Sequence, residues 1–132
     1  PDLTHLPFLN WREWMFKLAE FRYAIHLMQT YAAGSFMMNC GYLGIPCIGY
    51  NHTDTQRNIF PDLSIDQDDL ETARKLARKL VDDKDFYNEC SQKAIVNFEK
   101  HSSETSFNKW KDNFFDKVDD LIDGKISYIG DY

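Results

Sequence analysis

YAIHLMQTYAAGSFMMNCGYLGIPCIGY, residues 23–50, is the stretch of this sequence that decides the fold. Residues 23–28 are apolar or aromatic with one polar interruption at His26, which is typical of a buried parallel strand. Residues 35–43 carry apolar side chains at helical spacing, and residues 47–50 form a second short apolar run. Two parallel strands joined by a helix make a right-handed βαβ crossover, so we predict an α/β fold with a small parallel sheet flanked by helices.

The predicted helix over residues 35–43 has a clear end. Gly44 stands where a helix C-cap glycine is expected, and Pro46 blocks continuation. Three side chains of this helix share one face, which we expect to pack against the sheet: Phe36, Cys40 and Leu43.

The loop from Gln29 to Ser35 follows the first strand at its carboxyl end. In open α/β sheets, ligands bind in the crevice beyond this end. The loop also leads into a helix N-terminus, whose free amides and dipole favour an anion such as a diphosphate. Gly34 and Ser35 are therefore candidate phosphate-binding residues. The alternative is an ordinary tight turn that needs the flexibility of glycine.

The composition is that of a folded, acidic protein. The chain has 132 residues, enough for one domain with its own core, and 43% of them are hydrophobic. The formal net charge of -6 argues against a general nucleic-acid binder. No apolar run approaches the ~20 residues that span a bilayer. The three cysteines show no metal-like pairing, so we expect reduced thiols and a cytoplasmic location, with peripheral membrane association left open.

Shorter elements are predicted on both sides of the central stretch. Asn10 and Glu13 form a capping-box pattern, which predicts an amphipathic helix over residues 11–21. The remaining expectations are a strand over residues 5–9, a short helical turn that Pro61 ends, and a strand over residues 63–65.

The second half of the chain is predicted to be helical, with helices over residues 70–81, 85–101 and about 103–122. Asp68 and Glu71 suggest a capping box for the first of these helices. Ser102 or Ser103 is expected to cap the third, and Gly124 to end it.

The last predicted helix carries the strongest apolar stripe of the chain: Phe107, Trp110, Phe114, Val118, Leu121 and Ile122. Such a stripe packs in a core or forms an interdomain surface. If nothing covers it, an exposed apolar patch of several hundred Å2 usually finds a partner. We therefore expect self-association through this C-terminal aromatic helix.

The segment Gly34–Gly49, GSFMMNCGYLGIPCIG, resembles the donor-binding segment of GT-B glycosyltransferases, close to the family 4 type. In that family a glycine-containing loop opens a helix, and a turn of the G-x-P-V-I kind follows. Here that turn is Gly44-Ile45-Pro46-Cys47-Ile48. An aspartate-marked helix, a further helix after a D-x-x-x-[FY] turn, and a final crossing helix follow in the family's order. The resemblance covers most of the chain.

The resemblance implies a nucleotide-diphosphate sugar as the ligand, no cofactor, and diphosphate contacts from the backbone amides at Gly34 and Ser35. Many family members carry two glutamates, one for the donor sugar and one for the ribose. Those positions fall here on Tyr31 and Asn39. Asn39 can hydrogen-bond ribose hydroxyls and Tyr31 can stack on a sugar, but neither is acidic. This departure leaves open whether the anomeric configuration is retained or inverted.

The polar loop over residues 51–57 follows the second strand, so we expect it at the same ligand edge. Asp54 and Arg57 are candidate donor-binding residues for a sugar hydroxyl or a phosphate, since arginine is suited to bidentate phosphate recognition. The alternative is a helix N-cap at Thr53 or Asp54 with a solvent-facing arginine.

Other chemistry is not indicated by the sequence. The histidines do not fall in a metal-ligand spacing, so we expect no metal site. His26 lies inside a predicted strand, where an interior role is commoner than catalysis. Cys40 would need a histidine partner to act as a nucleophile, and the sequence identifies none.

Taken together, the resemblance implies one domain over residues 1–132, the C-terminal portion of a GT-B donor-binding domain with a partial Rossmann-like fold. The family's N-terminal domain and first βαβ unit have no counterpart in this sequence, so we expect the chain alone to be inactive. The alternative is a non-catalytic α/β protein-interaction module. A flavodoxin-like or receiver-like domain ranks last, because it needs an acidic cluster at the strand ends and this sequence does not show one.

Overall fold

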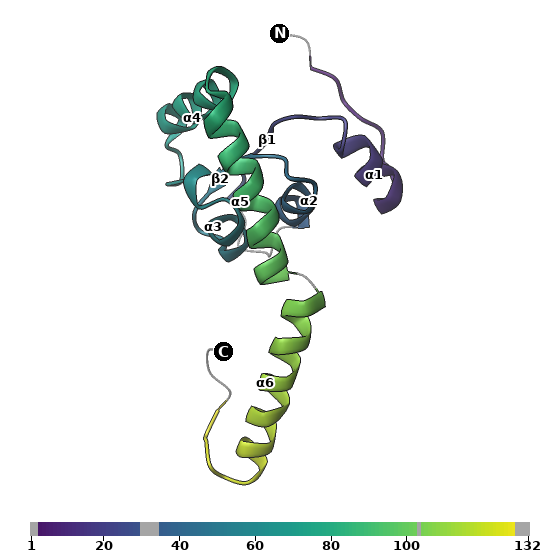
Figure 1. Ribbon diagram of the computed structural model, residues 1–132, viewed down its shortest axis with the longest axis vertical. Helices are drawn as coiled ribbons and strands as arrows, with labels where there is room; N and C mark the ends of the chain where they lie inside the picture. Colours follow the sequence, from purple (N-terminus) through teal and green to yellow (C-terminus); the bar gives the residue numbers. More distant parts are fainter. Residues whose placement is uncertain (1–2, 30–34, 103, 129–132) are drawn as a thin grey trace.

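A computed structural model, which describes residues 3–29, 35–102 and 104–128, shows an α/β fold (Figure 1). Its three parallel strands are β1 (Ala24–His26), β2 (Cys47–Tyr50) and β3 (Ser64–Ile65). They form one sheet in the order β1-β2-β3, so β2 is central. Ala24 pairs with Cys47, and Gly49 pairs with Ser64. The parallel sheet predicted from the central stretch is confirmed.

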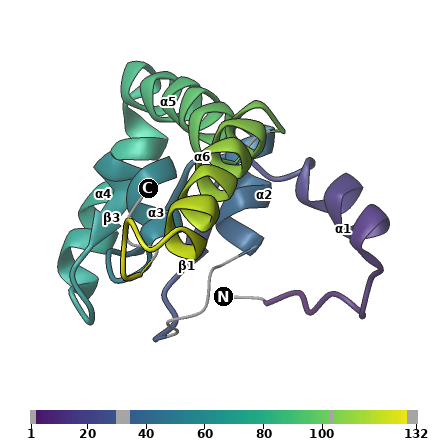
Figure 2. The same ribbon diagram turned by 90° about the horizontal axis from the view of Figure 1, so that it is seen from below.

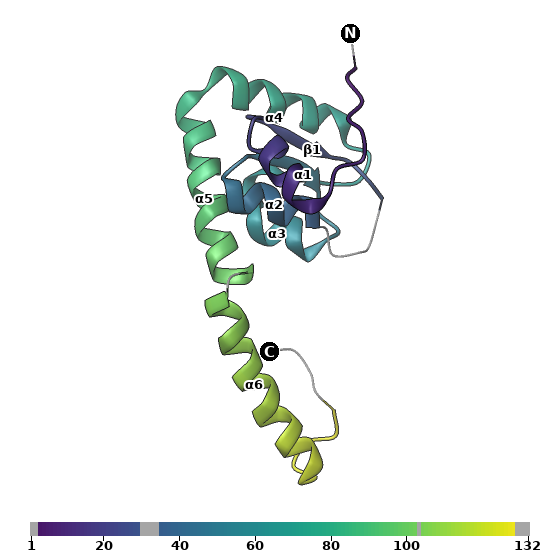
Figure 3. The same cartoon turned by 90° about the vertical axis from the view of Figure 1, so that its right-hand side faces the viewer.

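The helices are α1 (Trp11–Leu18), α2 (Ser35–Leu43), α3 (Asp54–Ile59), α4 (Leu70–Asp82), α5 (Lys84–Ser102) and α6 (Glu104–Ile122), with a 3-10 turn, η1 (Pro61–Leu63), before β3. α2 and α3 lie on one face of the sheet and α4 lies on the other (Figure 3). Right-handed crossovers that run in the same direction along a sheet place their helices on the same face. α5 packs against α2, α3 and α4. We call the sheet together with α2, α3, α4 and α5 the α/β body.

The core lies between the sheet and these helices. In α4 Ala73 and Leu80 are buried, whereas Leu70 and Val81, at the two ends of the apolar stripe expected for this helix, are exposed. In α5 Cys90 and Ala94 are buried. The face predicted for α2 packs on the core: Cys40 is buried, and the half-buried Phe36 and Leu43 pack against the core cluster. Met37, which was not expected on this face, is also buried. All three cysteines are free and buried, as expected.

Capping interactions explain where α1 begins and where α2 ends. At α1 the Asn10 side chain accepts the Glu13 amide at 2.9 Å, and the Glu13 carboxylate accepts the Asn10 amide at 3.2 Å. At the end of α2, Gly44 has a φ of 68°, which an L side chain rarely adopts. The Ile45 amide donates to the Cys40 carbonyl at 2.9 Å and the Gly44 amide to the Gly41 carbonyl at 3.2 Å, so these two carbonyls at the end of α2 are satisfied.

Several boundaries differ from the sequence predictions. Residues 5–9 form no strand, because no neighbouring strand among the described residues offers them a ladder. α1 stops at Leu18, three residues earlier than expected, and Pro61 begins η1 as well as following α3. Ser102 is the last residue of α5, and Ser103 lies outside the described residues.

α1 lies beside α2 at one side of the body, where the rings of Trp14 and Phe36 are 6.1 Å apart (Figure 2). α6 instead continues beyond α5 and projects away from the α/β body (Figures 1 and 3). In the part of the chain that is described, no helix has the length and apolar character needed to cross a membrane.

Candidate functional site

The carboxyl ends of the three strands lie at one edge of the sheet, because all three strands are parallel. Hydrogen bonds connect the segments that leave these ends. The Gln29 amide, after β1, donates to the Asp68 carboxylate at 3.5 Å, although the two residues are 39 positions apart. The Asn51 amide, after β2, donates to the Asp66 carboxylate at 2.6 Å. These two contacts join the loops of all three strands into one polar edge.

The predicted residues Asp54 and Arg57 are brought together at this edge. The Arg57 guanidinium donates to the Asp54 carboxylate and to the backbone carbonyl of Asn51. The side chain of Asp54 is 83% exposed and that of Arg57 is 48% exposed. Arg57 therefore connects two residues of the segment after β2 through hydrogen bonds, while part of its side chain remains exposed to solvent.

Ser35 is the first residue of α2, which follows β1 and begins at the same edge. Asn39 is half-buried and lies one turn further along α2. It shares a helix face with Ser35, because the two residues are four positions apart. The first turn of α2 contains no acidic residue. Of the other predicted residues, Tyr31 and Gly34 lie outside the described residues.

The acidic residues of the loop after β3 were not foreseen as part of this edge. The sequence pattern assigns the cap of α4 to Asp68, and this assignment is wrong. Asp69 is the N-cap, and it accepts both the amide of Thr72, at 3.1 Å, and its hydroxyl, at 2.6 Å. These bonds lower the pKa of Asp69. Asp68 adopts a φ of 66° and turns its carboxylate to Gln29.

The loops at this edge are acidic on balance, since Asp54, Asp66, Asp68 and Asp69 lie in the segments after β2 and β3 and Arg57 is the one basic residue there. Within the described ranges, however, no three histidine, cysteine or acidic side chains come close enough to hold a metal ion. Carboxylates and amides accept hydrogen bonds from hydroxyls, and the carboxylates repel phosphates.

Thr53 and Gln56 match a capping-box spacing, but the structure does not use it. The Thr53 side chain makes no cap bond to α3, and its buried hydroxyl has no hydrogen-bond partner among the residues the structure describes. The Gln56 amide turns inward and donates to the carbonyls of Cys47 at 2.9 Å and Leu63 at 3.5 Å. Gln56 thereby ties the start of β2 to the approach to β3.

His26 and the cysteines have structural roles. The His26 ring stacks on Phe36 with centroids 5.5 Å apart, at the end of β1. A hydrogen bond with Cys40, together with burial, holds the pKa of the Cys47 thiol well above its ordinary value. A protonated, buried thiol is a poor nucleophile, so this pair fits packing better than catalysis.

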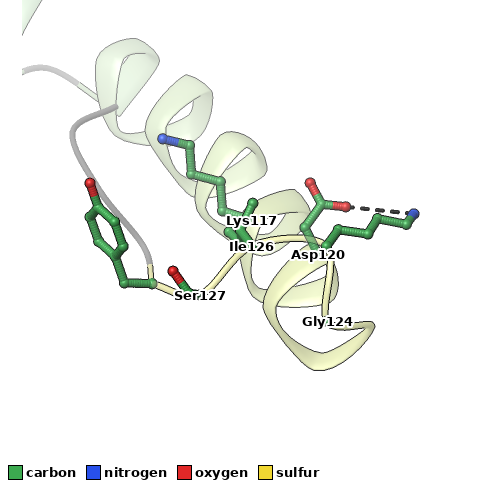
Figure 4. Close-up of a pocket in the computed structure, with 7 residues that line it drawn as sticks. Lys117, Asp120, Gly124, Ile126 and Ser127 are labelled. Carbon is green, nitrogen blue, oxygen red and sulfur yellow. Dashed lines mark ion pairs between the residues drawn. The ribbon is translucent and has the colours of Figure 1, made fainter.

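A hollow of the described part of the molecule lies elsewhere. Its volume is about 740 Å3, and it lies between the end of α6 and the segment that follows it, lined by Lys117, Asp120, Gly124, Lys125, Ile126, Ser127 and Tyr128. Figure 4 shows the Asp120–Lys125 ion pair beside it, at 3.8 Å. None of the residues predicted to bind the donor lines this hollow, so we place the candidate site at the carboxyl edge.

We compared the chain with protein-family models, curated proteins and solved structures, and none of them matches it. The resemblance to GT-B glycosyltransferases therefore depends on the sequence motifs quoted above.

Proposed function

We propose that this chain supplies the nucleotide-diphosphate-sugar half-site of a GT-B glycosyltransferase. The observation that carries the proposal is the polar edge itself. The Gln29–Asp68 and Asn51–Asp66 hydrogen bonds gather the loops of three parallel strands beside the N-terminus of α2. Ligands of open α/β sheets bind at this edge.

The charges suggest how a donor would lie. The diphosphate belongs at the start of α2, near Gly34 and Ser35, because the helix amides and dipole favour an anion and no carboxylate stands in the first turn. The acidic loops after β2 and β3 suit hydroxyls, so the sugar belongs near Asp54 and Arg57. Asn39, one turn along α2, and Tyr31 complete the set of proposed contacts.

In this arrangement the chain acts on the leaving group. Amides at the start of α2 stabilise the negative charge that develops on the diphosphate as the glycosidic bond breaks. We assign no general base and no acceptor contact to these residues. The chain alone is therefore proposed to bind the donor without transferring the sugar.

A nucleotide titration with one informative variant tests the proposal. Ligand-observed NMR against UDP, GDP, ADP and their sugar conjugates should show binding to one nucleotide family. Ser35→Asp should weaken this binding at least about tenfold, because it places a carboxylate where the diphosphate would lie. The same substitution favours the helix dipole, so loss of binding cannot be ascribed to a weaker α2.

Gln92→Glu is the matched control, because it adds one negative charge at an exposed position of α5. It should leave binding unchanged. Failure of every nucleotide to bind, or equal binding by Ser35→Asp and the original protein, would contradict the donor half-site.

A non-catalytic interaction module is the second candidate, and one observation favours it. α6 exposes aromatic side chains, with Phe107 56% exposed and Phe115 57% exposed. Absence of nucleotide binding together with association through α6 would support this second function.

A further inference from the structure

The apolar side chains of α6 gather along one side of the helix. At about 100° per residue, six of them fall within one arc, in which Lys111 is the one polar residue between Phe107 and Ile122: Phe107, Phe114, Phe115, Val118, Leu121 and Ile122. We call these six residues the α6 stripe. The opposite side carries Lys109, Asp112, Asp116 and Asp120, and Asp119 lies on the flank of the stripe next to Phe115. Phe107, Phe115 and Ile122 are 56%, 57% and 76% exposed.

The exposed part of the stripe is large enough to form an interface. The exposed fractions of its side chains correspond to roughly 400 Å2 of apolar surface. Two such stripes in contact would bury about 800 Å2, and the flanking side chains bring the total to the ~1,000 Å2 of a specific interface. A second copy of the same helix is therefore a sufficient partner.

The position of α6 in the molecule favours one relative direction of the two helices in a dimer. Each α6 is attached to its α/β body at its N-terminal end and projects away from it (Figures 1 and 3). A parallel pair would bring both bodies to the same end, against each other. An antiparallel pair places the bodies at opposite ends of a helix pair about 28 Å long.

The charges along α6 favour the same arrangement. The first half of the helix carries Glu104, Lys109, Lys111 and Asp112, and the second half, which is the more acidic, carries Asp116, Lys117, Asp119 and Asp120. Of these residues, Lys111 lies within the arc of the stripe and Asp119 lies on its flank. In an antiparallel pair with Phe107 beside Ile122 of the second copy, Lys111 lies beside Asp119 of that copy. A parallel pair would set like charges beside one another, which is destabilising.

From the stripe, the projection and the charges, we infer that this protein forms an antiparallel homodimer through α6. The two-fold axis passes near Phe114 and Phe115, so that these rings meet at the centre of the interface. The inference stands apart from the donor-site proposal, since no donor-binding residue belongs to α6.

Sedimentation equilibrium of the full chain is the first test. The protein should behave as a dimer of 15.6-kDa chains with a dissociation constant in the micromolar range. Phe115→Asp should raise that constant at least about tenfold, because it buries a carboxylate at the centre of the interface. Phe8→Asp removes an aromatic ring that is 96% exposed outside α6 and should leave it unchanged.

Charge exchange tests the orientation. Lys111→Asp and Asp119→Lys should each weaken the dimer by about threefold or more, and the double variant should restore it, because both contacts regain opposite charges. Circular dichroism of each variant checks that α6 remains helical. A monomer at concentrations up to about 100 µM would overturn the inference. A double variant no tighter than the single ones, or equal effects of Phe8→Asp and Phe115→Asp, would also overturn it.

Discussion

Gly49→Ala should strongly destabilise the protein, although the new residue is small and a strand normally prefers it to glycine. Gly49 lies in the central strand β2, beside the buried side chain of Gln56. A Cβ atom at this position would meet the Gln56 Oε1 at 2.5 Å and its Cδ at 2.6 Å. Because no real Cβ contact is this short, the Gln56 amide must move.

The free-energy cost of the substitution follows from the hydrogen bonds that the Gln56 side chain makes. Its amide nitrogen donates to the carbonyls of Cys47 and Leu63, and displacement leaves these buried acceptors without a partner. The loss of a buried hydrogen bond costs about 1–3 kcal/mol, and overpacking adds a similar amount. Alanine loses less conformational entropy on folding than glycine does, and this difference offsets less than about 1 kcal/mol of the destabilisation. We expect a net loss of about 3 kcal/mol, which lowers Tm by about 10 °C for a chain of this length.

A double-mutant cycle in urea provides the assay. Gln56→Ala should itself be destabilising, since it removes the same hydrogen bonds. In that background Gly49→Ala should cost less than about 0.5 kcal/mol, because the clash is gone. If Gly49→Ala is as stable as the original protein, or costs the same in both backgrounds, then Gln56 does not hold β2 to the segment before β3 as described.

Two further predictions concern the caps and the buried thiols. Asn10→Ala removes the acceptor of the Glu13 amide and should cost about 1 kcal/mol, visible as faster hydrogen exchange in α1, whereas Glu13→Gln keeps the capping box and should not. Burial, assisted by Asp62 and Glu89, raises the pKa of the Cys90 thiol from 9.0 to about 11. The folded state therefore holds this proton more tightly than the unfolded state, so its stabilisation is complete below about pH 9 and is lost as the pH rises towards 11. Unfolding in urea at about pH 8 and pH 10.5 should show a larger loss in the original protein than in Cys90→Ala, and equal losses in both would refute the assignment.

Much of the candidate site could be located from the sequence, but its internal contacts could not. The spacing of strand, loop and helix placed Ser35, Asp54 and Arg57 near the carboxyl ends of the strands. It did not reveal Asp66 and Asp68, because their roles depend on Gln29 and Asn51, which are distant in the chain. A run of aspartates before a helix looks like a cap, and only the fold shows which aspartate caps and which faces the site.

The sequence by itself determined the βαβ unit, the end of α2 and the start of α1. Apolar runs, the glycine at position 44 and the Asn10–Glu13 box act within a few residues, because helix hydrogen bonds and caps join near neighbours. Tertiary structure alone decided the rest. Residues 5–9 form no strand because a strand needs a distant partner, and Gln56 is buried because its amide nitrogen meets the carbonyls of Cys47 and Leu63, which only the fold brings near it. The exposure of the α6 stripe was likewise decided by the fold, since an amphipathic pattern predicts an apolar face without showing what lies against it.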